Sequence, residues 1–206
     1  TPKYYRLFDD AMTYCYGNAT MINGAIYIPA YNAASTIPKV LDRIPEDIRD
    51  KVVEIFIVDN NSSDNTHLVA IGYRETKGLH NLEVIRNKEN LGYGGSQKLA
   101  YKRSIEKGYE YVAMLHGDAQ YAPELLATLI EPITSGKADM VFGSRMRGDP
   151  LAGGMPYHRY LGNKFLTTVQ NWFLGTNLSE FHSGYRVYNV KALSQVPFDR
   201  LSSDYH

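Results

Sequence analysis

The chain has 206 residues, enough for a domain that buries roughly 70% of the surface its unfolded form would expose. Lys plus Arg and Asp plus Glu each number 22, so the chain lacks the net positive charge typical of proteins that bind duplexes, and no nucleic-acid partner is expected. The single cysteine, Cys15, cannot form an internal disulfide, and no apolar run approaches the ~18 residues of a membrane span. These features predict a cytoplasmic location, with a lead-in arm over residues 1–22 and one folded domain over residues 23–206.

Short apolar, β-branched runs alternate with helical patterns along the chain. Strands are predicted at residues 24–28, 52–58, 82–86, 111–115 and 140–143. Helical apolar spacing occurs at residues 37–44 behind Ser35 as N-cap, at 125–133 after Pro123, and at Leu161, Phe165, Val169, Trp172 and Phe173. The alternation predicts an α/β fold, in which a mostly parallel sheet is covered by helices on both faces as in a Rossmann-like three-layer sandwich.

Polar segments follow four of the predicted strands, at residues 29–32, 59–64, 116–120 and 144–147. Because ligands of parallel sheets bind at the carboxyl ends of the strands, we expect these segments to form one site. Asp59 opens a run of short polar side chains that ends at Thr66. Such a run can either accept hydrogen bonds from a nucleotide base or cap the following helix, and the residues alone leave both functions open.

His116, Asp118 and Gln120 are three metal-ligand types at alternate positions. On an extended segment they would point to one side, an arrangement that suits a divalent cation bridging two phosphates. The alternative is a plain turn with a solvated aspartate.

Two further features indicate anion binding more weakly. The glycine-rich run at 91–96 precedes a predicted helix but lacks the residues of a P-loop, so a tight turn is the stronger expectation. Four arginines in the last third of the chain can clamp phosphate as a set or simply be solvated; they are Arg145, Arg147, Arg159 and Arg186.

The ordered set of motifs resembles the family 2 glycosyltransferases of the GT-A fold, and within them the polyprenyl-phosphate sugar transferases, such as the dolichyl-phosphate mannose synthases. The motifs are Pro29-Ala30-Tyr31-Asn32, the segment 58–66, Asn90-Leu91-Gly92, the segment 118–124, Gly143-Ser144-Arg145 and Ser183-Gly184-Tyr185-Arg186. The resemblance covers about residues 22 to 195.

The resemblance implies a donor-binding set for a nucleotide diphosphate sugar: Pro29, Tyr31, Asn32, Asp59, Asn61 and Gly94. It places His116, Asp118 and Gln120 in the family's metal motif, with Asp118 holding Mn²⁺ or Mg²⁺ against the diphosphate. It also implies that Arg145 and Arg159 contact an acceptor phosphate, while Ser183 and Arg186 border the acceptor and the sugar.

Two positions depart from the family pattern. His116 replaces the first acidic residue of the metal motif, and Glu180 stands where many relatives carry aspartate. Glu180 is the candidate general base if the acceptor is a hydroxyl, whereas a phosphate acceptor is already ionised and needs only positioning by arginines. Many relatives also continue into further helices, so we expect the catalytic domain to be truncated at its C-terminus.

The implied function is inverting, metal-dependent transfer of a sugar to polyprenyl phosphate, with peripheral contact at the membrane surface. The alternatives are transfer to a saccharide or glycan hydroxyl and donor binding without catalysis. A sugar-phosphate nucleotidyltransferase is disfavoured because Pro29-Ala30-Tyr31-Asn32 stands where its Gly-rich, Arg- and Lys-containing signature would follow the first strand.

Overall fold

The computed structural model of the chain describes residues 22–151 and 154–204. These residues fall into two compact units, one formed by the chain up to Val141 together with the segment from Arg186 onward, and a second formed by Phe142–Tyr185. The arm expected over residues 1–22 lies outside the described residues except for its last position.

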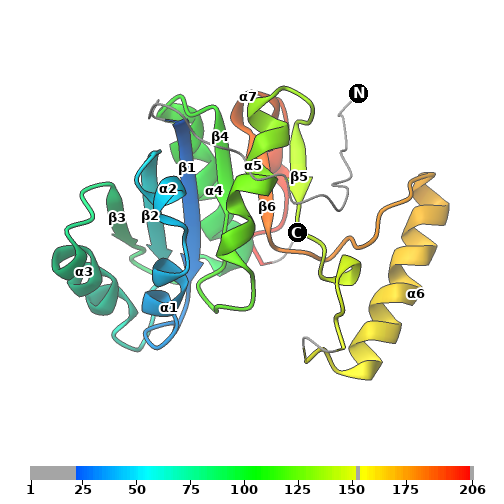
Figure 1. Cartoon of the computed structure of the whole chain (residues 1–206), viewed down its shortest axis with the longest axis horizontal. Helices are drawn as coiled ribbons and strands as arrows, with labels where there is room; N and C mark the ends of the chain where they lie inside the picture. The colour runs from blue at the N-terminus through cyan, green and yellow to red at the C-terminus, as the bar shows by residue number, and fades with distance from the viewer. Residues whose placement is uncertain (1–21, 152–153, 205–206) are drawn as a thin grey trace. The chain divides into compact units, whose positions relative to one another are not determined.

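A six-stranded sheet in the order β3-β2-β1-β4-β6-β5 forms the centre of the fold (Figure 1). Its strands are β1 (Ile22–Ala30), β2 (Val52–Asp59), β3 (Leu82–Arg86), β4 (Tyr111–Met114), β5 (Met140–Phe142) and β6 (Arg186–Asn189). Strand β1 is parallel to β2 and β4, and β2 is parallel to β3, so the predicted mostly parallel sheet is confirmed. Strand β6 is antiparallel to β4.

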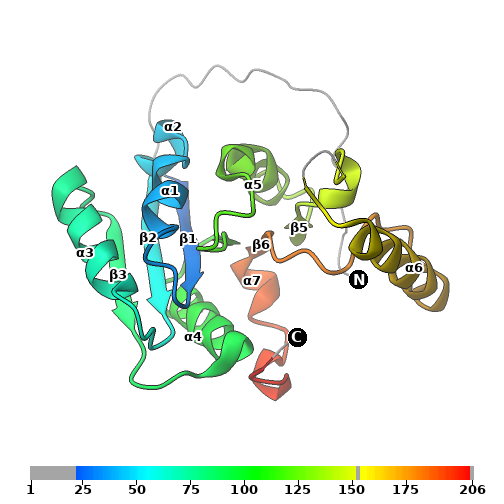
Figure 2. The same ribbon diagram turned by 90° about the horizontal axis from the view of Figure 1, so that it is seen from below.

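Helices cover both faces of this sheet in the first unit: α4 and α7 lie on one side, and α1 and α5 on the other (Figure 2). The helices are α1 (Ile37–Asp42), α2 (Glu46–Arg49), α3 (Thr66–Lys77), α4 (Gly92–Glu106), α5 (Leu126–Thr134), α6 (Tyr157–Leu174) and α7 (Val190–Leu193). Single 3₁₀ turns occur at Pro123–Leu125, Arg145–Arg147 and Phe198–Arg200.

The prediction of Ser35 as the N-cap of the first helix is wrong. Helix α1 is preceded by Thr36, whose hydroxyl donates to the carbonyl oxygens of Ala33 (3.1 Å) and Gly117 (2.6 Å) rather than capping an amide. The threonine therefore joins the end of β1 to the loop after β4, two segments that both carry predicted site residues.

The core of the first unit consists of the β-branched and aromatic side chains of the strands. Ile26, Ile28, Ile55 and Ile57 are fully buried, and burial of each contributes roughly 1.5–3 kcal/mol. The register pairs Ala30 with Asp59 and Asp59 with Arg86, so the ends of β1, β2 and β3 lie side by side. This register brings the polar segments after β1 and β2 together.

Helix α6 belongs to the second unit and contains the third apolar stripe predicted from the sequence. Leu161, Phe165, Trp172 and Phe173 are all exposed on it, so the stripe does not form part of a core among the described residues.

Candidate functional site

A pocket of about 510 Å³ opens at the carboxyl ends of β1, β2 and β4 in the first unit. Five of the residues predicted to bind donor or metal line it: Pro29, Tyr31, Asn32, His116 and Asp118. Other lining residues, which had no predicted role of their own, include Thr36, Asn60, Asn90 and Tyr93. The remaining predicted donor and metal residues, Asp59, Asn61, Gly94 and Gln120, do not line the pocket.

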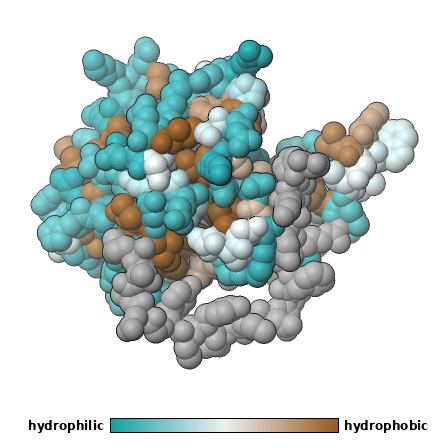
Figure 3. Space-filling view, turned by 90° about the horizontal axis from the view of Figure 1, so that it is seen from above, coloured by the Kyte–Doolittle hydropathy of each residue, from teal (hydrophilic) through white to brown (hydrophobic). Residues whose placement is uncertain are grey.

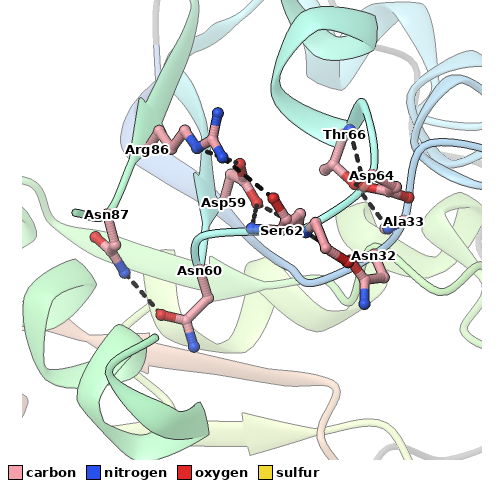
Figure 4. Close-up of polar contacts among 10 residues, drawn as sticks. Asn32, Ala33, Asp59, Asn60, Ser62, Asp64, Thr66, Arg86 and Asn87 are labelled. Carbon is pink, nitrogen blue, oxygen red and sulfur yellow. Dashed lines mark hydrogen bonds and ion pairs between the residues drawn. The ribbon is translucent and has the colours of Figure 1, made fainter. Parts of the chain in front are cut away.

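The loops after β1 and β2 are joined by side-chain hydrogen bonds (Figure 4). Asn32 Oδ1 accepts from Ser63 N at 3.0 Å, and Asn32 N donates to Ser62 Oγ at 2.9 Å. Thr66 Oγ1 accepts from Ala33 N at 2.8 Å. The contacts hold Asn32 at a positive φ of 51°, a conformation that asparagine tolerates better than most residues.

Asp59 is buried, and its carboxylate is used within its own loop. Its Oδ1 accepts from the backbone N (3.0 Å) and the hydroxyl of Ser62, while Oδ2 lies 3.6 Å from Arg86 Nε (Figure 4). Asn65 is the N-cap of the next helix and makes no side-chain cap bond; the preceding residue, Asp64, instead accepts from Thr66 N at 2.9 Å through its Oδ1. The Thr66 hydroxyl, bonded to the same carboxylate, holds the pKa of Asp64 below its usual value.

Asn60 is the residue of this segment that lines the pocket. Its Nδ2 donates to Asn90 Oδ1 at 2.7 Å and to the carbonyl oxygen of Gly92 at 3.1 Å, and its Oδ1 accepts from Leu91 N at 3.0 Å. These bonds fix the loop that leads into α4, where the glycine-rich run 91–96 begins. Asn61 is exposed, and Gly94 is buried within α4.

The predicted metal segment is a turn rather than an extended strand, so the expectation that alternation aligns its side chains is wrong. Ala119 has a φ of 63°, and Asp118 Oδ1 accepts from Gln120 N at 3.0 Å. Asp118 and His116 nevertheless line the same pocket. Gly117 between them packs closely, since a Cβ there would lie 3.0 Å from the carbonyl oxygen of Pro29.

The Nε2 atom of His116 lies 2.9 Å from the hydroxyl oxygen of Tyr93, within hydrogen-bonding distance. Burial raises the pKa of Tyr93 well above its usual value, so this hydroxyl stays protonated and can donate to an unprotonated Nε2. A cation bound at that nitrogen would therefore have to displace Tyr93.

A second pocket, of about 360 Å³, lies in the unit Phe142–Tyr185 and has a cationic lining. Both arginines predicted to contact an acceptor phosphate line it, together with Met155, Gly162, Asn163, Leu166 and His182. Arg145 stands at the start of a 3₁₀ turn, and Arg159 lies in the first turn of α6.

Glu180 is fully buried beside this pocket's Arg145 and is held by several donors. Its Oε1 accepts from Arg145 Nη2 (2.6 Å) and Nε (3.2 Å) and from Asn163 Nδ2 (2.9 Å). Its Oε2 accepts from Arg145 N at 2.9 Å and from Ser144 Oγ at 3.5 Å. Two nitrogens of the Arg145 guanidinium therefore donate to one carboxylate oxygen, Oε1, which fixes the orientation of the guanidinium.

The two other predicted acceptor residues lie in different units. Ser183, in the second unit, is buried, and its hydroxyl accepts from Tyr185 N at 3.3 Å. Arg186 begins β6 in the first unit and donates from Nη1 to the Tyr188 hydroxyl at 3.3 Å.

The described residues contain no cluster of three or more His, Cys, Asp or Glu side chains arranged to hold a metal by themselves. His116 and Asp118 alone form an incomplete ligand set. Mg²⁺ and Mn²⁺ commonly complete such a set with water and substrate phosphate oxygens, so the pair fits a cation that enters with a diphosphate. In the same ranges, 22–151 and 154–204, no helix is both long and apolar enough to cross a bilayer.

Comparison with known proteins decides the family. The model of glycosyl transferase family 2 matches residues 25–196, which is most of the chain. The chain belongs to this family. The resemblance deduced from the motifs is thus confirmed, and the match includes every lining residue of both pockets except Asp204.

The chain is similar to the low-salt glycan biosynthesis hexosyltransferase Agl6 of Haloferax volcanii, at 31% identity over 82% of this chain and 38% of the relative. It is 24% identical to the polyprenol monophosphomannose synthase of Mycolicibacterium smegmatis, over 86% of this chain and 66% of that protein. Among solved structures, the mannosyltransferase PcManGT of Pyrobaculum calidifontis, in complex with GDP-Man and Mn²⁺, superposes with a TM-score of 0.60 at 20% identity, over 86% of this chain and 48% of that one. This likeness confirms the GT-A fold. The chain therefore spans between about a third and two thirds of these proteins.

Proposed function

We propose that this family 2 domain is an inverting glycosyltransferase that moves a sugar from a nucleotide diphosphate sugar to a phosphate acceptor, a polyprenyl phosphate. The observation that carries the choice of acceptor is the second pocket, where two arginines converge and the nearby carboxylate, Glu180, is buried against one of them. A pocket with fixed guanidinium donors suits an anion that is ionised before it binds.

The pocket of the first unit is the proposed donor site. Tyr31 and Asn32 offer an exposed ring and an amide for the base and ribose. Asn60, which also lines the pocket, fixes the loop before α4 by its hydrogen bond to Asn90. Because the lining comes from the ends of neighbouring parallel strands, the position is the one at which open α/β sheets bind nucleotides. Asp59 acts here by fixing the loop through Ser62, and Asn61 and Gly94 lie beyond the lining.

We assign the cation to Asp118, with His116 as a second ligand. A bound Mn²⁺ or Mg²⁺ supplies positive charge against the leaving diphosphate. Tyr93 sets the orientation of His116 through its hydroxyl, and the Asp118 turn fixes the carboxylate at the rim of the pocket. Gln120 is left as a weaker candidate because it lies outside the lining.

Arg145 and Arg159 would hold the acceptor phosphate, one oxygen of which attacks the anomeric carbon from the face opposite the leaving diphosphate. That single displacement inverts the configuration and requires no general base, because a phosphate monoester already carries negative charge at neutral pH. Glu180 is then a positioning residue for Arg145. A fully buried carboxylate with both oxygens hydrogen-bonded is poorly placed to take a proton from a hydroxyl acceptor.

The relatives support this acceptor class. Similar proteins are named polyprenol monophosphomannose synthase, undecaprenyl-phosphate mannosyltransferase and dolichol-phosphate mannosyltransferase. An acceptor of this kind resides in a bilayer, so the proposed function places the domain at a membrane surface.

A thermal-shift screen of nucleotide sugars, with and without Mn²⁺ or Mg²⁺, tests the donor half of the proposal. At a ligand concentration of 100 Kd, binding should stabilise the fold by about 2.7 kcal/mol. One nucleotide diphosphate sugar should raise the Tm only when the cation is present, and Asp118→Ala should abolish that rise. A metal-independent shift that survives in Asp118→Ala would overturn the assignment.

A further inference from the structure

Segment 198–204, which we call the strap, lies against the first half of helix α4 in the first unit. At one end of the strap, the buried ring of Phe198 meets the Tyr101 ring of α4 edge to face, with centroids 5.5 Å apart. Further along, Lys98 Nζ of the same helix donates to the carbonyl oxygen of Leu201 at 2.5 Å. The strap is therefore fixed on α4 by an apolar contact and by a hydrogen bond from a lysine.

The glycine-rich run at the start of α4 accommodates the last residues of the strap. Gly95 N donates to the carbonyl oxygen of Ser203 at 2.9 Å, and Gly94 N donates to that of Asp204 at 3.4 Å. Gly92 has a φ of 75°, and a Cβ at this position would overlap the carbonyl oxygen of Ser203. The strap therefore occupies helix amides that an anion would otherwise use, and the close approach requires glycine.

The strap brings one side chain, that of Asp204, to the donor pocket. Asp204 lines this pocket together with Asn90 and Gly92. Among the described residues, the hydrogen bonds of Asp204 are made by its backbone, and the residue is exposed. Hydrophilic side chains cover much of the face of the first unit that Figure 3 shows, so exposure alone does not distinguish this carboxylate. Its place in the pocket lining does.

The other groups in the lining restrict what this carboxylate can bind. The described residues that line the pocket include two carboxylates, Asp118 and Asp204, and neither Lys nor Arg. Asp118 is assigned to the cation. A second carboxylate repels a diphosphate, but it accepts charge-assisted hydrogen bonds from hydroxyl groups, as carboxylates do from the ribose of dinucleotides. A nucleotide diphosphate sugar carries such hydroxyls on its ribose and on the transferred sugar.

We propose that Asp204 binds the donor by accepting hydrogen bonds from its sugar hydroxyls, and that Lys98 positions Asp204 through the strap. Lys98 lies outside the pocket lining, and its ammonium is within 3.4 Å of the carbonyl oxygen of Asp199 and the hydroxyl of Ser203 as well as bonded to Leu201. The inference rests on the proposed donor site and adds to it a residue supplied by a distant part of the sequence.

Calorimetric titration with UDP, GDP, UDP-glucose and GDP-mannose, each with Mn²⁺, tests the role of Asp204. Asp204→Ala should raise the Kd of the nucleotide that binds by about tenfold, the loss expected for one charge-assisted hydrogen bond. The matched control is Asp199→Ala in the same strap, whose carboxylate pairs with Lys102 at 2.9 Å outside the lining and whose loss should leave the Kd unchanged. An equal Kd in Asp204→Ala would overturn the proposal. So would a lower Kd, because the carboxylate would then only repel the diphosphate.

The same titrations separate the two sources of hydroxyl groups. Weaker binding of both the free nucleoside diphosphate and the nucleotide sugar would assign Asp204 to the ribose. Weaker binding of the nucleotide sugar alone would assign it to the transferred sugar. If no nucleotide bound the unchanged chain, the proposed donor site itself would be refuted, and this inference with it.

A double-mutant cycle tests whether Lys98 acts through Asp204. Lys98→Met retains the aliphatic stem but removes the ammonium, so it should raise the Kd of the nucleotide several-fold in the unchanged chain and hardly at all in Asp204→Ala. Trypsin should also cleave Lys98→Met faster after the exposed Arg200 of the strap, as followed by mass spectrometry. Faster cleavage with an unchanged Kd, or equal effects of Lys98→Met in both backgrounds, would refute the positioning role.

Discussion

Replacement of Glu180 by glutamine discriminates between the two possible roles of this carboxylate. The substitution retains the size of the side chain but turns one oxygen into an NH₂ group. In the structure, that group would face either Arg145 N–H, 2.9 Å from Oε2, or the guanidinium and Asn163 donors at Oε1. At least one buried donor therefore loses its acceptor, at a cost of about 1–3 kcal/mol.

The electrostatic part of the loss is smaller than for a fully buried pair. Removing one partner of a buried ion pair costs about 3–5 kcal/mol, but the Arg145 side chain is 38% exposed, so water replaces part of the interaction. We therefore expect Glu180→Gln to destabilise the fold by about 2 kcal/mol. For a chain of this length, that corresponds to a fall in Tm of roughly 4–8 °C, which differential scanning calorimetry would detect.

The kinetic result separates the two roles. If Glu180 positions Arg145, Glu180→Gln should raise the KM for the phosphate acceptor by about tenfold, with kcat within a few-fold of the unchanged enzyme and the same pH profile. Loss of a general base would instead lower kcat by ~10² or more. A collapse of kcat at unchanged acceptor KM would refute the positioning role and indicate a hydroxyl acceptor. Glu180→Asp, which keeps the charge, should recover part of the acceptor affinity.

Three other substitutions test the remaining parts of the two pockets. Arg159→Ala should raise the acceptor KM or lower kcat by at least about tenfold, because a charge-assisted hydrogen bond contributes roughly 1.5–3 kcal/mol; initial rates that leave both constants unchanged would remove Arg159 from the acceptor site. His116→Asp should shift the metal preference toward Mg²⁺, as carboxylate oxygen is the harder ligand, and a metal-activation profile identical to that of the unchanged chain would show that His116 is not a ligand. Asp59→Ala should loosen the loop that positions Ser62 and thereby weaken donor binding by about 1–3 kcal/mol in calorimetric titration, whereas an unchanged nucleotide Kd would show that this loop does not shape the donor pocket.

The sheet was predictable because fully buried parallel strands leave an unambiguous pattern. The runs at β1, β2 and β4 are continuous apolar segments that end in polar loops, and sequence reasoning located each within a few residues. Strand β6 was missed because Arg186-Val187-Tyr188-Asn189 contains one fully buried residue, and its pairing with β4 depends on contacts distant in sequence. Local pattern carries no information about such pairing.

The residue types of the site were predictable, but not their partners. The sequence placed Asp118 and His116 after a strand, and both line the donor pocket; it did not anticipate that a left-handed Ala119 makes the segment a turn. It also treated Arg145 and Glu180 as separate functional groups, because 35 positions separate them in the sequence. In the folded chain the two side chains form one ion pair, so the Glu180 carboxylate is already bonded to Arg145.

Assays with a defined acceptor decide whether the chain transfers the sugar to a phosphate. The purified chain should be incubated with the donor identified by thermal shift, Mn²⁺ or Mg²⁺, and either a polyprenyl monophosphate or the matching polyprenol, which lacks the phosphate. We expect a glycosyl phosphate product of inverted anomeric configuration from the monophosphate and none from the polyprenol, as resolved by mass spectrometry and ³¹P and ¹H NMR. Transfer to saccharide hydroxyls with no product from polyprenyl monophosphate would contradict it.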